Sequence, residues 1–137
     1  MFMSLMFSSR LLGDRGGSPA LDPHYFFPIT EYIYWIVKDK KEFFFDKSKS
    51  VFKSTIWRMN VDKNPHPAPF PYIMAANIIS CCSKEGDIVY DPFMGSGTTA
   101  LACVRLGRHY IGSEISEKYV SMANEKIRIE ESQLKLF

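Results

Sequence analysis

The part of the sequence best suited to chemistry is a glycine-rich loop with a carboxylate on either side. It runs Asp91-Pro-Phe-Met-Gly-Ser-Gly-Thr-Thr99, and Glu114 follows Gly95 by 19 residues. Glycines at positions 95 and 97 permit positive φ and let the backbone approach a ligand closely. A helix beginning at Thr98 would offer free N–H groups to an anion. A carboxylate at the end of the next strand can accept ribose hydroxyls. The spacing predicts a site for a nucleoside-bearing cofactor.

Several ligands suit a loop of this kind, and residue chemistry separates them. A triphosphate loop needs Gly-Lys-Ser/Thr, whereas Gly97 is followed directly by Thr98. Gly95, Gly97 and Ala100 satisfy the dinucleotide pattern, so an NAD-dependent oxidoreductase stays an alternative. Asp91 places a carboxylate near the expected pyrophosphate position and suits a cationic amino group instead. S-adenosylmethionine therefore fits better than a dinucleotide, and a purely structural glycine turn is a further alternative.

The elements expected around this loop form a β-α-β unit. A strand should lead into the loop, a helix with small residues should follow it, and a second strand and a long helix should come next. An earlier apolar stretch is helical by length and composition. Such a unit implies parallel strands and an α/β class. In chain order, the expected ranges are helix 72–83, strand 87–91, loop 92–97, helix 98–106, strand 109–113 and helix 117–134.

The part of the chain before residue 60 is predicted to be β-rich. Eleven of the 20 aromatic residues lie between Tyr25 and Trp57. Runs of aromatic and β-branched residues are typical of strands. They predict strands at 31–37, 42–46 and 53–59, the first of them buried on both faces.

Charge is concentrated in the centre of the chain. The 137 residues carry a net charge of +2, but residues 38–63 alone hold eight bases and four acids. An anionic polymer such as double-stranded DNA could dock there, although a solvated hairpin is the alternative. The residues proposed to contact phosphates are Lys38, Lys40, Lys41, Lys47, Lys49, Lys53 and Arg58.

The composition argues against a membrane or secreted protein and against a bound metal. No apolar run approaches the roughly 18 residues that span a bilayer, and no basic residue precedes the apolar start of the chain, so neither a membrane span nor a secretory signal is expected. Cys81, Cys82 and Cys103 lack metal-ligand spacing. They are interpreted as buried free thiols of a cytoplasmic protein without a bound metal.

Three segments together resemble the beta group of bacterial DNA amino-methyltransferases. They are residues 64–71, with His-Pro-Ala-Pro-Phe-Pro, residues 86–99 and residues 107–116. The resemblance implies a Rossmann-like methyltransferase fold and methyl transfer from S-adenosylmethionine to cytosine N4 or adenine N6 in DNA, as in restriction-modification systems. The target base stays open, with a slight tilt toward cytosine. The cofactor contacts it implies are His66, Phe70, Asp91, Phe93, Gly95, Ser96, Gly97, Thr98, Glu114 and Ile115, the last packing on the adenine.

The sequence departs from this family at the catalytic tetrapeptide, Asp/Ser/Asn-Pro-Pro-aromatic. The family uses its polar side chain and a proline carbonyl to orient the target amino group, and its aromatic residue to stack on the flipped base. The single look-alike is Asp22-Pro-His-Tyr25, where histidine replaces the second proline. Asp22 and Tyr25 are thus the candidate catalytic residues, with an ordinary loop as the alternative. We expect a truncated or frame-shifted product with little or no methyl transfer of its own.

The sequence thus predicts an α/β fold whose parallel sheet is incomplete and flanked by helices. Residues 1–20 form an atypical N-terminal segment, 21–63 a β-rich segment with a recognition hairpin, and 64–137 the cofactor-binding half. Open sheet edges favour assembly with a complementary methyltransferase fragment or a second copy. Besides a DNA methyltransferase, a non-catalytic remnant that binds DNA or a companion subunit stays an alternative.

Overall fold

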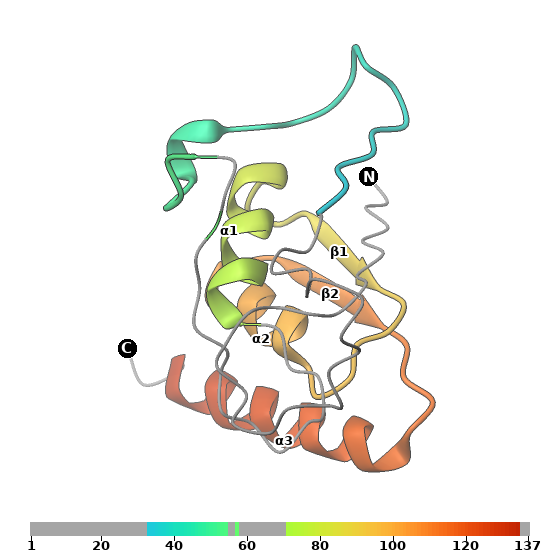
Figure 1. Ribbon diagram of the computed structural model, residues 1–137. Helices are drawn as coiled ribbons and strands as arrows, with labels where there is room; N and C mark the ends of the chain where they lie inside the picture. The colour runs from blue at the N-terminus through green and yellow to red at the C-terminus, as the bar shows by residue number, and fades with distance from the viewer. Residues whose placement is uncertain (1–32, 55–56, 58–70, 135–137) are drawn as a thin grey trace, which may run out of the picture.

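The computed structural model describes residues 33–54, 57 and 71–134, and Figure 1 shows how their elements are arranged. Four of the five elements predicted after residue 71 agree with the structure to within one residue at each end, and the long C-terminal helix agrees at both ends. The elements are η1 (Lys47–Lys49), α1 (Tyr72–Cys82), β1 (Ile88–Asp91), α2 (Thr98–Arg105), β2 (His109–Gly112) and α3 (Glu117–Leu134).

The two strands pair in parallel, with α2 as the crossover between them. Ile88 is opposite His109, and Asp91 is opposite Gly112. Both strands therefore end at the same edge of the sheet. Pairing continues beyond that edge, because Ser113 N donates to Asp91 O over 3.0 Å. The α/β class and the parallel pairing are thus confirmed, as a small two-stranded sheet in the described part of the chain.

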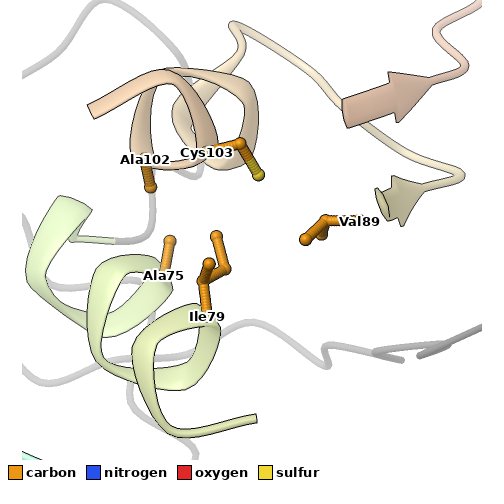
Figure 2. Close-up of a cluster of buried hydrophobic side chains, with 5 residues drawn as sticks. All are labelled: Ala75, Ile79, Val89, Ala102 and Cys103. Atoms are coloured by element: carbon orange, nitrogen blue, oxygen red, sulfur yellow. The ribbon is translucent and has the colours of Figure 1, made fainter. Parts of the chain in front are cut away.

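Helices α1 and α2 pack against one face of this sheet. Figure 2 shows Ala75 and Ile79 of α1 meeting Ala102 and Cys103 of α2, with Val89 of β1 beside them. The small side chains of α2 let the helices approach closely. All three cysteines are free and buried, as predicted. Burial raises the pKa of the Cys103 thiol to about 12, so it packs as a neutral group.

Helix α3 is fastened to α2 by a bidentate ion pair. Arg105 Nε and Nη2 each donate to one oxygen of the Glu130 carboxylate at 2.7 Å. These hydrogen bonds hold the pKa of Glu130 below its usual value.

On the sheet, side chains alternate as the strand period requires. Val89 faces the helices, while Ile88 and Ile111 are exposed.

The strands predicted before residue 60 are not found in the described residues there. The described parts of the predicted strands, residues 33–37, 42–46 and 53–54 with Trp57, are not in strand conformation. Tyr34 and Ile36 are exposed, so burial of this stretch on both faces is also wrong. Aromatic and β-branched residues favour strands only where a neighbouring strand supplies the ladder. Within the described residues, the pairing is that of β1 with β2.

This segment is instead attached to α1 by side-chain packing and hydrogen bonds. The buried Asn77 side chain accepts from Val51 N at 2.8 Å and from Ser50 Oγ at 3.2 Å. Asp46 N donates to Cys81 O at 2.8 Å. Local turns and hydrogen bonds to α1 thus take the place of the strand pairing that the sequence pattern predicts.

Ile79 offers a test of the packing between α1 and the sheet. Its side chain is 2% exposed, whereas Ile73 on the same helix is 41% exposed. We expect Ile79→Ala to lower the free energy of unfolding by about 2–5 kcal/mol, because it leaves a cavity in the core. Ile73→Ala, the matched control, should change it by less than about 0.5 kcal/mol. Chemical denaturation measures both, and equal effects would contradict this core.

Candidate functional site

The loop between β1 and α2 turns tightly on its own hydrogen bonds. Asp91 Oδ1 accepts from Phe93 N at 3.0 Å, and Gly97 N donates to Met94 O at 3.0 Å. Gly95 and Gly97 have φ of 53° and 81°, in the left-handed region that favours glycine. The sequence predicted this requirement at both positions.

Glu114 connects the end of β2 to this loop. Its Oε2 accepts from Gly95 N at 2.9 Å, and its Oε1 accepts from Ser116 N at 2.8 Å. The carboxylate is thereby oriented by two backbone amides across the strand-end edge. A carboxylate has about four acceptor positions, so such a group can also bind hydroxyls. The structure thus brings together Gly95 and Glu114, which the sequence placed in one site.

A cavity of about 140 Å³ lies where the loop, β2 and α3 meet. Ligand pockets for whole cofactors usually hold about 300–1,000 Å³, so this smaller, partly open cavity suits a part of such a molecule. Gly112 allows the Met94 side chain to lie over β2, since a Cβ at 112 would be 1.4 Å from Met94 Cε. The cavity is lined by Met94, Gly95, Tyr110, Gly112, Glu114, Val120, Ala123 and Asn124.

Helix α3 packs against the glycine loop, and the sequence analysis did not predict this contact. A Cβ at Gly97 would lie 2.8 Å from Ala123 Cβ, so glycine permits the close approach. Lys126 Nζ donates to Ser96 O at 2.7 Å. Burial lowers the pKa of Lys126. The buried positions Ala123 and Ile127 mark the inward face of α3, and that periodicity was the available signal.

The N-terminus of α2 follows directly after the loop. The first hydrogen bond that closes this helix runs from Leu101 N to Gly97 O, at 2.9 Å. The N–H groups of Thr98, Thr99 and Ala100 therefore precede the first closed turn. Such N–H groups and the helix dipole favour an anion at this end.

The remaining predicted cofactor residues differ in their placement. Ser96 and Gly97 are buried in the loop. Asp91 is half-buried and does not line the cavity, and its Oδ1 is engaged by the loop itself. Phe93 and Ile115, on the segments that follow β1 and β2, are 79% and 100% exposed.

Other predicted residues lie away from the cavity or outside the described residues. The six described lysines of the predicted DNA surface, Lys38 to Lys53, are all exposed on the segment that precedes α1. Within the described residues, no helix is long and apolar enough to cross a membrane, and no cluster of three or more metal-ligating side chains occurs. The predicted residues outside the described ranges are Asp22, Tyr25, Arg58, His66 and Phe70.

The parallel β-α-β unit, the glycine loop and the strand-end carboxylate define an α/β protein with a site at the edge where open sheets bind nucleotide-like ligands. A family model described as DNA methylase, of the N6/N4 type, matches residues 13–125. The chain belongs to this N6/N4 DNA methylase family. The resemblance drawn from the sequence motifs is thereby confirmed.

Curated relatives with similar sequences are bacterial methyltransferases. The type II methyltransferase M.SmaI of Serratia marcescens is 36% identical over 110 residues, covering 71% of this chain and 37% of its own. The type II methyltransferase M2.DpnII of Streptococcus pneumoniae is 32% identical over 127 residues, covering 82% and 47%. The chain therefore spans less than half the length of these relatives.

Solved structures give the same family. The M1.HpyAVI complex with SAM superposes with a TM-score of 0.58 at 34% identity, over 71% of this chain and 50% of the other. A putative DNA modification methylase from Thermus thermophilus, TTHA0409, complexed with S-adenosyl-L-methionine, has a TM-score of 0.54 at 28% identity, over 82% and 49%. The fold described above is thus that of part of a DNA methyltransferase.

Gly97 and Gly86 form a matched pair for testing the contact between the loop and α3. Both have φ of +81°, but a Cβ at Gly86 would have nothing within 4 Å. We expect Gly86→Ala to cost about 1–2 kcal/mol of stability, from backbone strain alone. Gly97→Ala should cost about 1–3 kcal/mol more, because Ala123 must shift. Thermal and chemical denaturation compare the two, and equal losses would contradict the close approach.

Proposed function

We propose that this chain binds S-adenosylmethionine in a DNA amino-methyltransferase of the restriction-modification type, acting on cytosine N4 or adenine N6. The observation that carries the proposal is the Glu114 carboxylate, held by Gly95 N at the strand-end cavity. Its placement suits ribose hydroxyls. Relatives solved with this cofactor support the choice of ligand.

The residues present fit this cofactor. Glu114 would hold the ribose, and the cavity beside it is large enough for part of the nucleoside. Ile115 follows Glu114 directly and would pack on the adenine, and Phe93, two residues after Asp91, would also contact the cofactor; both side chains are exposed. Asp91 and the N-terminus of α2 offer opposite charges, which suit the ammonium and the carboxylate of an amino-acid group.

When bound, the cofactor would supply an electrophilic methyl group on a sulfonium. The chain's contribution is then to orient that molecule on a rigid loop and to exclude water from one side of it. No metal or covalent intermediate is needed for direct displacement. The candidate catalytic segment, residues 22–25, lies outside the described residues.

We further propose the division of labour that the sequence predicts. Residues 64–137 would bind the cofactor in an incomplete, Rossmann-like methyltransferase sheet. Residues 21–63 would face double-stranded DNA, and residues 1–20 would form an atypical N-terminal segment. The described lysines between positions 38 and 53 support this, since all of them are exposed and available to phosphates.

Glu114→Gln tests the cofactor site. The substitution keeps the size of the side chain but replaces a carboxylate oxygen by an amide donor. Hydrogen bonds to charged groups contribute about 1.5–3 kcal/mol, so the affinity for S-adenosylhomocysteine should fall about tenfold to hundredfold. Glu117→Gln, at the exposed start of α3, is the control and should leave the affinity unchanged. Isothermal titration calorimetry measures each Kd.

The same titrations decide among the alternatives. Tighter binding of NAD than of S-adenosylmethionine by the unaltered chain would favour an oxidoreductase and overturn the proposal. Failure to bind either cofactor, together with co-purification of a companion chain that carries the missing tetrapeptide, would favour a non-catalytic remnant.

The basic segment is tested through the salt dependence of DNA binding. Each phosphate contact contributes about 0.9 to the slope of log K against log salt. The double substitution Lys40→Gln/Lys41→Gln should lower that slope by about 1.8. The control Lys118→Gln/Arg128→Gln removes two exposed cations from α3 and should not lower it. Fluorescence anisotropy with a labelled duplex measures the slopes, and equal slopes for both variants would contradict this surface.

A further inference from the structure

We propose that Lys126 is a positioning residue that holds the glycine loop in the shape that receives the amino-acid end of the cofactor. The inference rests on the proposed function. It starts from a contact between α3 and the loop, because Lys126 Nζ donates to Ser96 O at 2.7 Å across 30 residues of sequence.

Three consecutive loop residues are each held by a different side chain. Gly95 N donates to the Glu114 carboxylate, Ser96 O accepts from Lys126, and Gly97 lies against Ala123. The first two contacts are polar and hold the Met94–Gly95 and Ser96–Gly97 peptide planes. Ser96 is itself buried, so its carbonyl has little access to water once the lysine is removed.

The position of the ammonium group also matters for charge. It lies at the carbonyl of the residue just before Gly97, which caps the N-terminus of α2. A helix N-terminus carries about half a positive charge. A second positive group beside it strengthens the attraction for an anion, such as the carboxylate of an amino-acid group. Lys118 lies on the same helix, but its side chain is exposed, so it serves as the comparison for the partly buried Lys126.

The contact is tested first without ligand. Lys126→Met keeps most of the apolar stem and removes the donor and the charge, whereas Lys126→Arg keeps both. Lys118→Met is the matched control. We expect amide hydrogen exchange at Gly95 and Gly97, whose N–H groups donate to Glu114 and to Met94 O, to become about tenfold faster in Lys126→Met and to stay unchanged in the control. Unchanged exchange in Lys126→Met would overturn the inference, whatever the chain binds.

Two ligands then separate positioning from a general loss of structure. S-adenosylhomocysteine carries the amino-acid end, and 5′-methylthioadenosine lacks it. Lys126→Met should weaken the first about tenfold and the second less than twofold, and Lys126→Arg should restore most of the loss. An equal loss for both ligands would show a merely structural role and overturn the inference. If the unaltered chain binds neither ligand, the proposed function fails, while the exchange measurement still decides whether Lys126 holds the loop.

Discussion

Parallel pairing of β1 with β2 is the constraint on which the site depends. Because the strands run in the same direction, Asp91 and Gly112 end at one edge, and the loop after β1 meets the residues after β2. The carboxylate of Glu114 can then reach Gly95 N, 19 residues away in sequence. An antiparallel pair would place these two ends at opposite edges. The site is therefore a consequence of topology before it is a consequence of any single residue.

Close packing on one side of the sheet makes this edge rigid. Ala102 and Cys103 are small enough for α1 and α2 to meet over Val89, and the ion pair of Arg105 with Glu130 fixes α3 against α2. With α3 fixed, Ala123 and Lys126 can support the loop from behind. The same helix that fills the core thus also shapes the loop. This explains why small residues occur at positions where the backbones approach.

The elements from α1 onward could be predicted because their signals are local. A strand, a glycine loop and a helix with small residues follow one another within 20 residues, and Gly97 has the positive φ that its type predicts. The contact of Lys126 with Ser96 could not be predicted, because it depends on how α3 sits against the loop. The expected strand at 42–46 is absent for a related reason. A strand needs a partner, and the sequence of one segment does not specify whether a partner lies beside it.

The local chemistry of the loop also bears on which cofactor suits it. A dinucleotide would bring a pyrophosphate toward the loop, close to the carboxylate of Asp91, and two like charges near each other are unfavourable. A sulfonium nucleoside brings an ammonium and a carboxylate instead, which suit Asp91 and the N-terminus of α2 respectively. Met94 lies over Gly112 and is one of the residues that line the cavity of about 140 Å³. The charges at the loop thus favour the sulfonium nucleoside over the dinucleotide, and this supports the cofactor proposed here.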